Sequence, residues 1–255
     1  MVLRAAPYGE ADLLVTFLTL DFGVVTAFAK SPRKIKSRFG SSLEPFTLST
    51  ISLWGKEDAR LPKLTQSDII RPFQGLREDL GCFLRLSEAA ELTINFLPEG
   101  EPSREAFHLL RRTLEMSEAG CSALCAIVYK IKLLGLAGFA PRLSGCARCG
   151  REGGSFFVSQ GSILCPGCAH GMHAHENRNG TVVADRGAMA MSAGAVRLYR
   201  TLSQWDIAKT ARVRASEGML AQLSALLDAH IEYRLSKRLR TREAYASFKV
   251  GLGRS

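Results

Sequence analysis

The sequence predicts an α+β protein of several domains: a small antiparallel β-barrel first, then a mostly α-helical C-terminal domain with an inserted four-cysteine element. Three observations carry this prediction. Short apolar runs separated by turn residues fill roughly the first 70 positions, and from Arg77 apolar residues recur every three or four positions. Two Cys-x2-Cys pairs then interrupt the helical part. A chain of 255 residues is long enough to bury a core.

Four short strands are expected in the N-terminal segment. The first two, residues 13–20 and 24–29, flank the turn signal at Asp21-Phe22-Gly23. Residues 46–54 alternate apolar and polar side chains, which is typical of a half-buried strand, and residues 61–65 form one more short or edge strand. Because several short antiparallel strands leave few open edges when they close on themselves, residues 1–78 are assigned to a barrel.

Helical periodicity accounts for most of the remaining chain. Three apolar stripes are expected on successive helices: Leu80, Phe83/Leu84, Ser87, Ala90, Ile94 and Leu97; Phe107, Leu110 and Leu114; Leu124, Ile127, Val128, Ile131 and Leu134. Ser103 is the expected cap of the second helix, and the third spans residues 122–136. The last 60 residues are helical again, with Gly218 as a break. Residues 79–140 and 186–255 therefore form the two parts of the helical domain, around an insert at 141–185.

The insert carries the sharpest signal in the sequence. Its cysteines follow the pattern Cys146-x2-Cys149, fifteen residues, Cys165-x2-Cys168. Two thiolates separated by two residues can bind one ion when the backbone turns tightly between them, and the neighbouring glycines favour such turns. The residues between the pairs predict a hairpin that joins two knuckles. Four thiolates complete a tetrahedron without leaving an open position, so the pattern predicts one structural, non-catalytic Zn²⁺ ion.

Other interpretations of the cysteines remain open at this point. The pairs could form a redox-active motif, disulfides or four unligated thiols, although a redox motif needs only one pair. His170, His173 and His175 follow closely and offer a replacement ligand, but are expected to be solvated or to lie outside the ligand shell. The other cysteines, Cys82, Cys121 and Cys125, lie beside helical apolar stripes and are interpreted as core thiols.

The charge balance points to an anionic partner. The chain has 34 basic and 24 acidic residues, a net charge of +10 and a pI near 9.5. Of the basic residues 24 are arginine, whose planar fork of donors suits phosphate. Residues 196–255 hold 12 basic and 5 acidic side chains, so the excess is concentrated at the C-terminal end. The alternative is an arginine-rich composition that reflects a GC-rich genome.

A first basic cluster lies in an expected loop of the barrel. The candidate DNA-binding residues are Lys30, Arg33, Lys34, Lys36 and Arg38, with the neighbouring ring of Phe39 for base stacking. No acidic residue occurs between Asp21 and Glu44. Cations that contact phosphates beside an aromatic ring that stacks on bases are typical of single-strand binding. The alternative is a solvated loop that only keeps the protein soluble.

A second basic cluster lies near the C-terminus. It consists of Arg234, Lys237, Arg238, Arg240 and Arg242 on the last long helix. Ile231, Leu235 and Leu239 recur every four residues and are expected to face the core, which would leave the basic side chains on an exposed arc. A solvated helix face is the alternative, and the sequence does not show whether the two clusters share one surface.

Several function classes lack their motifs. The chain has no phosphate-cradling Gly-x-x-x-x-Gly-Lys-Ser/Thr, no His-Glu-x-x-His and no Gly-x-Ser-x-Gly, so an enzyme is not expected. The N-terminal residues show no secretory signal, and no apolar window reaches the roughly 18 residues of a membrane span. Seven cysteines, grouped as above, indicate a reducing compartment. We expect a cytoplasmic, nucleoid-associated protein without membrane contact.

Several segments together resemble the bacterial RecO family of DNA repair proteins. They are residues 7–12, Gly23, the basic loop through Lys36-Ser37-Arg38-Phe39-Gly40, residues 43–46, residues 72–80, Phe96-Leu97-Pro98-Glu99, residues 133–141 and both Cys-x2-Cys pairs. The resemblance covers nearly the whole chain in the same order. It is specific in the first 80 residues and at 133–168, and loose after about residue 195.

The resemblance implies an N-terminal OB-fold, a helical domain and a zinc-binding insert for which this chain keeps all four cysteines. It further implies binding to single- and double-stranded DNA and annealing of complementary strands. With RecR, members of the family help RecA to replace single-strand binding protein (SSB). The first hypothesis is therefore a non-enzymatic recombination mediator whose partners are DNA, RecR, SSB and, indirectly, RecA.

Two rival hypotheses come from other classes. In the first, the chain is an adaptor whose basic surface docks the acidic tail of SSB, and contact with DNA is secondary. In the second, it is a nuclease or another zinc enzyme. Competition between an acidic tail peptide and DNA separates mediator from adaptor, and turnover of nucleic acid with added divalent metal would favour the enzyme.

Overall fold

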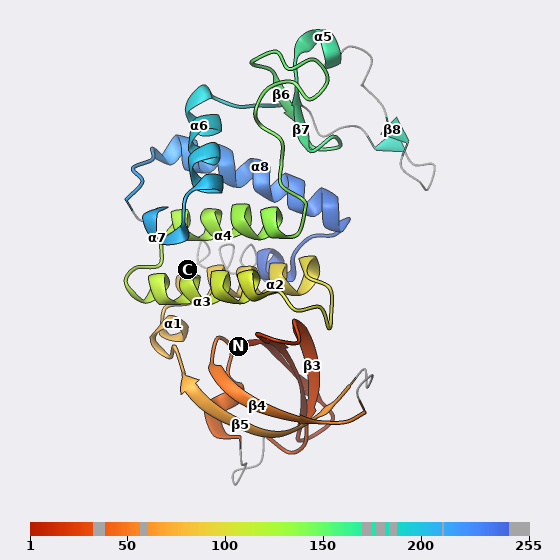
Figure 1. Ribbon diagram of the computed structural model, residues 1–255, viewed down its shortest axis with the longest axis vertical. Coiled ribbons are helices and arrows are strands. Elements are labelled where there is room, and N and C mark those ends of the chain that lie inside the picture. Colours follow the sequence, from red (N-terminus) through yellow and green to blue (C-terminus); the bar gives the residue numbers. More distant parts are fainter. Residues whose placement is uncertain are drawn as a thin grey trace, which may run out of the picture. The chain divides into compact units, whose positions relative to one another are not determined.

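A computed structural model describes residues 1–32, 39–56, 61–169, 188–210 and 212–244, together with the backbone of 175–176 and 182–183. The chain divides into two compact units, one of residues 1–122 with residues from 241 onward, the other of residues 123–240. This division differs from the four segments expected from the sequence, because the first helices belong to the same unit as the barrel. Figure 1 shows both units, coloured along the chain.

The N-terminal strands form one five-stranded sheet. They are β1 (Val2–Tyr8), β2 (Asp12–Leu18), β3 (Val24–Ala29), β4 (Leu48–Trp54) and β5 (Lys63–Arg71). Their order is β1-β2-β3-β5-β4, with β3 and β5 parallel and the other pairs antiparallel. The Val2 N–H donates to the Thr47 carbonyl (3.0 Å), and the Phe46 N–H donates to the Val2 carbonyl (2.9 Å), immediately before β4. These bonds close the sheet into an OB-type barrel, so the predicted fold class is confirmed.

The strands match the prediction in part. The expected strands at 13–20, 24–29 and 46–54 correspond to β2, β3 and β4. The last expected strand was too short, because β5 continues to Arg71, and the residue pattern did not reveal β1. That strand carries Pro7, lacks a strict apolar alternation and has a register irregularity after Val2, so it has a weak period-two signal.

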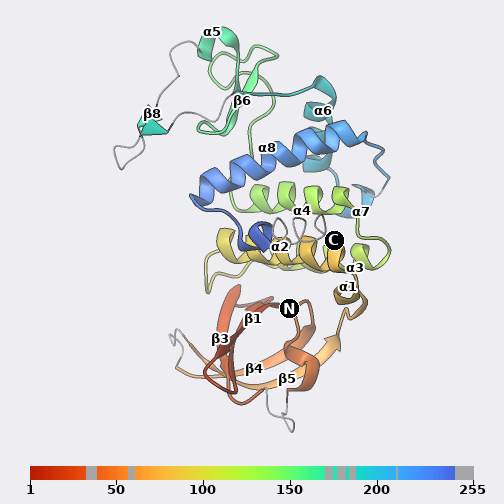
Figure 2. The same cartoon turned by 180° about the vertical axis from the view of Figure 1, so that it is seen from behind.

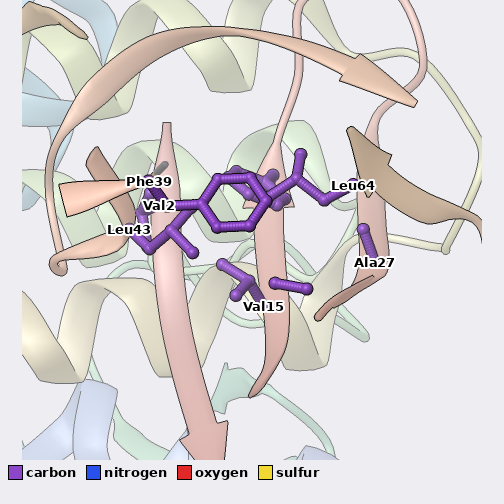
Figure 3. Close-up of a cluster of buried hydrophobic side chains, with 8 residues drawn as sticks. Val2, Val15, Ala27, Phe39, Leu43 and Leu64 are labelled. Atoms are coloured by element: carbon purple, nitrogen blue, oxygen red, sulfur yellow. The ribbon is translucent and has the colours of Figure 1, made fainter. Parts of the chain in front are cut away.

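The barrel encloses an apolar core (Figure 3). Inward-facing side chains from β1, β2, β3 and β5 meet residues of the connection before β4. The fully buried cluster consists of Val2, Val15, Phe17, Ala27, Ala29, Phe39, Leu43 and Leu64. Ile51 and Leu53 of β4 pack against it from the side. Because alternate residues of a strand face opposite sides, this core also fixes which side chains lie on the outer wall.

The same unit contains α1 (Gly75–Glu78), α2 (Leu80–Phe96) and α3 (Arg104–Glu118). Ser103 caps α3 as predicted, its hydroxyl accepting from the Ala106 N–H at 3.3 Å. The expected α2 stripe is confirmed only in part: Ala90 and Leu97 are buried, but Leu80 is 45% exposed. The buried face also includes Cys82, Leu86 and Thr93. Since α2 contacts α1, α3 and β1, it buries a wide arc, and a helix apolar on most sides gives no clear phase.

The second unit is built on α4 (Ala123–Leu136), α6 (Ala193–Gln204), α7 (Ile207–Thr210) and α8 (Glu217–Leu235). The α4, α6 and α8 helices contact one another in all three pairs (Figure 2). The α4 stripe is confirmed at Ile127, Val128, Ile131 and Leu134. The expected break at Gly218 is wrong, because Gly218 lies in the first turn of α8 and Ser216 caps that helix. The Lys130 ammonium, on buried α4, pairs with Asp228 of α8 at 3.0 Å.

The insert joins this unit between α4 and α6. It contains β6 (Ser155–Phe157), β7 (Ser162–Leu164) and α5 (Pro166–Ala169), and β10 (Met189–Ala190) completes a sheet of order β10-β6-β7. Two further short strands, β8 (His175–Glu176) and β9 (Val182–Val183), pair with each other. Over the described part of the chain, no helix has the length and apolarity to cross a membrane.

Candidate metal centre and nucleic-acid interface

The four cysteines of the insert come together as predicted. The sulfur atoms of Cys146, Cys149, Cys165 and Cys168 all lie within 4.8 Å of one another. The Sγ atoms of Cys149 and Cys165 are 3.6 Å apart. Cys146 and Cys165 are buried, whereas Cys149 is exposed. Four soft donors around one point, in a cluster that the structure leaves as free thiols, can hold one metal ion.

The first knuckle is shaped by its backbone. Gly145 and Gly150 have φ angles of 111° and 76°, which favour glycine. The Cys146 N–H donates to the Arg151 carbonyl at 2.8 Å, and the Gly150 N–H donates back to the Cys146 carbonyl at 2.9 Å. A side chain at position 145 would also meet the Gly150 carbonyl oxygen at 3.1 Å. The loop therefore doubles back tightly enough to present both thiols of the first pair on one side.

The hairpin and a short helix position the second pair. In the predicted hairpin, now confirmed, Ser155 of β6 pairs with Leu164 of β7, which places Cys165 directly after the strand. The first turn of α5 then follows, with the Cys168 N–H donating to the Cys165 carbonyl at 3.0 Å. Arg148 of the first knuckle donates to the Cys168 carbonyl at 3.2 Å and so links the two knuckles.

Two cysteines of the cluster have pKa values shifted in opposite directions. Backbone N–H groups, that of Cys165 first, donate to the Cys146 sulfur and lower its pKa to about 6 against the opposing effect of burial. The neighbouring thiols act in the other direction on Cys168: hydrogen bonds with Cys149 first, then with Cys165 and Cys146, raise its pKa to about 12. The thiolate form is thus favoured at Cys146 and the protonated thiol at Cys168, and binding of a cation would displace the Cys168 proton.

The histidines considered as ligands and the three remaining cysteines have different outcomes. His170 and His173 lie outside the described residues, and only the backbone of His175 is described, in β8. Cys82 and Cys125 are buried core thiols, as predicted. Cys121 precedes α4 and is only partly buried, so its interpretation as a core thiol is confirmed only in part. Burial, and next a side-chain hydrogen bond with Cys121, raise the pKa of Cys82 to about 12.

A histidine of α8 anchors the tip of the insert's hairpin. The Nε2 atom of buried His230 is 2.8 Å from the Phe139 carbonyl, so this nitrogen donates. Its ring lies edge to face against Phe156 of β6, with centroids 5.8 Å apart. Gly161, at the hairpin turn, lies so close that a Cβ there would meet His230 at 2.9 Å. Burial lowers the pKa of His230, so the ring is held neutral.

The basic loop is only partly described. Lys30 is exposed at the end of β3, whereas Arg33, Lys34, Lys36 and Arg38 lie outside the described residues. The expectation that Phe39 stacks on bases is wrong. Its side chain is 3% exposed, because it fills the barrel core between the strands and Leu43. A ring enclosed on both faces by the core has no face to offer a base.

The C-terminal basic cluster is not carried by one helix. The α8 helix ends at Leu235, and Ser236 adopts a left-handed conformation with φ of 53°. Arg234 therefore lies on α8, while Lys237 and Arg238 lie in the connection that follows, and a new helical turn begins at Arg240. Ile231 and Leu239 are fully buried, as predicted for the core face, but Leu235 is only partly buried.

Arg242 has an ionic partner of its own. Its Nε donates to Glu88 of α2 at 2.8 Å, and the pair is mostly buried. Next to it, the Thr241 hydroxyl donates to Glu91 at 2.7 Å. Both contacts fasten the helical turn at residues 240–244 to α2. Arg242 thus takes part in packing within the barrel-containing unit. Because Glu88 already compensates its charge, we favour the other basic residues as DNA contacts, and the assignment of Arg242 stays a prediction.

Sequence reasoning missed a group of side chains on the outer wall of the barrel. Trp54 is 72% exposed and Tyr8 is 53% exposed, and Lys63 of β5, which pairs with Trp54, is exposed as well. The signal was present: a tryptophan in the outward position of an alternating strand next to a charged turn is unusual for a solvated surface. The strand register that places Lys63 beside Trp54, and the contact of Tyr8 with Phe28, could not be inferred from the sequence.

The barrel, the helical unit and the closed four-thiol cluster define an α+β protein built from modules. Two family models match this chain: Recombination protein O N terminal over residues 1–73 and Recombination protein O C terminal over residues 77–243. Together they cover most of its length. The chain belongs to the recombination protein O (RecO) family.

Curated relatives agree with this assignment. A DNA repair protein RecO from Thermodesulfovibrio yellowstonii is 40% identical over 233 residues, which are 91% of this chain and 90% of that protein. One from Desulforamulus reducens is 33% identical over 260 residues, covering 100% of this chain and 95% of that protein. One from Anaeromyxobacter sp. (strain K) is 33% identical over 247 residues, 95% and 92% of the respective chains.

Proposed function

We propose that this chain is a non-enzymatic recombination mediator. It binds single- and double-stranded DNA, anneals complementary strands and, together with RecR, helps to load RecA onto strands coated with SSB, in the cytoplasm at the nucleoid. The observation that carries the proposal is the pairing of a closed OB-type barrel with full-length similarity to proteins named DNA repair protein RecO. OB-type barrels are a common scaffold for binding single strands.

Annealing in this proposal is electrostatic. Two DNA strands repel each other through their phosphates, and a protein with a net charge of +10 lowers that repulsion when it binds both. The candidate contacts are Lys30, Arg33, Lys34, Lys36 and Arg38 of the basic loop, with Arg234, Lys237, Arg238 and Arg240 at the end of α8 and beyond. Binding of this kind weakens as salt rises and has little sequence preference.

The metal in this proposal is one structural Zn²⁺ ion. At a Zn–S distance of about 2.3 Å, a tetrahedron has S···S edges of about 3.8 Å. The sulfur atoms lie within 4.8 Å of one another and the closest pair is 3.6 Å apart, so small side-chain adjustments fit them around the ion. The four-sulfur shell leaves no open position, so the ion fixes the fold of the insert and takes no part in chemistry.

The test is strand annealing followed across a salt series. Two complementary labelled oligonucleotides are mixed bare and coated with SSB, with and without RecR. Faster annealing that fades as salt rises is the expected result. Absence of acceleration, with tight binding to the acidic SSB tail alone, would contradict the mediator and favour the adaptor. Turnover of DNA with added divalent metal would contradict the non-enzymatic mechanism.

A further inference from the structure

The strand register places three side chains in one row across the outer wall of the barrel, and a ring contact adds a fourth. Trp54 of β4 pairs with Lys63 of β5, and Lys63 pairs with Phe28 of β3. The ring of Tyr8, at the end of β1, then lies edge to face against Phe28, with centroids 5.8 Å apart and planes at 83°. Since neighbouring strands are about 5 Å apart, Trp54 and Phe28 are separated by about 10 Å with one lysine between them.

The side of the sheet on which this row lies follows from alternation. Ala27 and Ala29 flank Phe28 and are fully buried in the core, and Leu64 follows Lys63 into the same core. Leu53 packs against that core, so Trp54 points outward. The row therefore lies on the outer wall of the barrel. Trp54 and Tyr8 expose large ring areas to solvent there, although aromatic rings are usually buried.

Among the residues that the structure describes, the exposed charges around the row are mostly positive. Lys30, Lys56 and Lys63 are exposed at this end of the barrel, and Lys30 opens the basic loop. Asp12 accepts a hydrogen bond from the Ser31 N–H at 2.7 Å, and its carboxylate holds the loop's first turn. Asp12 is half-buried, and Glu10 in the β1–β2 turn is the exposed carboxylate among the described residues of this end.

We propose that a single strand of DNA crosses this outer wall, with bases stacked on Trp54 and Tyr8 and phosphates held by Lys63 and Lys30. The proposal rests on the proposed function and names its contact surface. Alternating flat rings and cations match the alternation of bases and phosphates along an unpaired strand. An apolar protein partner would be opposed by the desolvation of Lys63 at the centre of the row, whereas a phosphate pairs with that charge.

The row also accounts for the wrong assignment of Phe39. The basic loop needs an aromatic platform to distinguish a single strand from a duplex, and the ring beside it in sequence is in the core. The register brings Tyr8, at 53% exposure, and Trp54, at 72%, to the end of the barrel at which that loop begins. The stacking surface is thus supplied by other strands.

The test uses the full chain and an oligothymidine of about 15 nucleotides, which spans one OB-type barrel. Trp54→Ala should weaken binding of this oligonucleotide by about tenfold, and Tyr8→Ala by less, because one stacked base is lost in each. Trp54→Phe should retain most of the affinity. Binding to a duplex of the same length should change less than twofold in all three variants.

Phe22→Ala is the matched control. Phe22 is also an exposed aromatic residue, at 66%, but it lies in the β2–β3 turn at the other end of these strands. Its removal should leave the affinity unchanged. A thermal melt of each variant shows that the barrel remains folded, as an outward side chain should allow.

The intrinsic fluorescence gives a second readout. The chain has two tryptophans, so Trp205→Phe leaves Trp54 as the reporter. Oligothymidine should quench it, and the quenching should persist at the salt concentration at which duplex binding is lost. If wild-type protein binds the single strand while Trp54→Ala binds equally well and Trp54 is not quenched, the row is wrong and the mediator function is untouched. If the wild type binds no DNA, the proposed function itself fails. Quenching by an acidic peptide but not by DNA would also overturn the proposal.

Discussion

The barrel and the insert are held together by different means. The barrel closes around eight buried apolar residues, and its backbone hydrogen bonds run around the whole sheet. The insert has strands of two or three residues, and the buried cluster around its sulfurs contains Cys146, Leu164 and Cys165, with Phe157 and Ala169 packed beside it. The hairpin also buries Phe156, Val158 and Ile163, but the cluster at the sulfurs is too small to give much hydrophobic stabilisation. The two knuckles therefore depend on their thiols, whereas the barrel depends on its core.

The largest expected effect follows from removal of the metal ligands. Cys146→Ser takes away the thiol whose pKa is lowered to about 6 and leaves three donors. Because metal binding by such sites supplies about 10–16 kcal/mol at pH 7 in isolated zinc-finger peptides, the insert should lose its bound metal and its fold. Metal content and amide exchange over residues 145–169 measure both, and exchange in the barrel should not change.

Cys121→Ser is the control for that variant. Cys121 is partly exposed and lies outside the insert, in the unit that contains the barrel. This variant should keep the full metal content and the slow exchange of the insert. Unchanged metal content and melting behaviour in Cys146→Ser would contradict the dependence of the insert on its thiols.

The next effect, on the barrel, should come from its core. Phe39→Ala should lower the free energy of unfolding by about 3–5 kcal/mol, because it leaves a cavity at the centre of the apolar cluster. Denaturant unfolding measures the loss, and the metal content should stay that of the wild type. A loss below about 1 kcal/mol would mean that Phe39 is not a core residue and would restore it as a candidate base contact.

The comparison also shows what the sequence could predict. The insert's site was predictable to the residue, because the ligands of each knuckle lie two positions apart and local turns bring them together. In the barrel, the alternation of β4 was visible, but the neighbours Lys63 and Phe28 are 35 residues apart in sequence and are joined only by register. Phe39 was misassigned for the same reason, since its neighbours in sequence are basic and its neighbours in space are Val15 and Leu64.

In the helical parts too, features set by residues close in sequence were predictable, whereas features set by distant residues were not. The caps at Ser103 and the stripe of α4 depend on residues within one or two turns, and both were confirmed. The end of α8 at Leu235 was not predicted, because an apolar residue every four positions continues through Leu239 while the backbone turns left-handed at Ser236. Likewise, the ion pair between Arg242 and Glu88 joins residues 154 positions apart.

A smaller effect should depend on pH and concern the anchor of the insert. Burial lowers the pKa of His230 below its usual value of about 6.5, so the unfolded chain takes up this proton first as the pH falls. His230 should therefore destabilise the fold progressively from about pH 6.5 down through its own lowered pKa, and should have no such effect above pH 7. Thermal melts of the wild type against His230→Gln measure the difference.

Glutamine is the informative replacement because its amide can still donate to the Phe139 carbonyl but does not titrate. Its stability should fall less steeply between pH 7 and pH 5 than that of the wild type. The other four histidines are present in both proteins, so they cancel in the comparison. Parallel curves for the two proteins would show that His230 is not held neutral at the hairpin. The barrel contains no histidine within residues 1–78, and its exchange should not follow this titration.

The smallest effect on stability is expected from substitutions in the basic loop, which should instead weaken DNA binding. Replacing Lys34, Lys36 and Arg38 together with alanine removes three cations from a segment without acidic residues. Each lost phosphate contact reduces the slope of log affinity against log salt by about 0.7 for a single strand, so three contacts reduce it by about 2. Filter binding of labelled oligothymidine across a salt series measures this slope, while the melting temperature and the metal content should stay as in the wild type. An unaltered slope and affinity at low salt would remove the loop from the interface and leave the outer wall of the barrel as the contact, because stacking on Trp54 and Tyr8 depends far less on salt than phosphate neutralisation does.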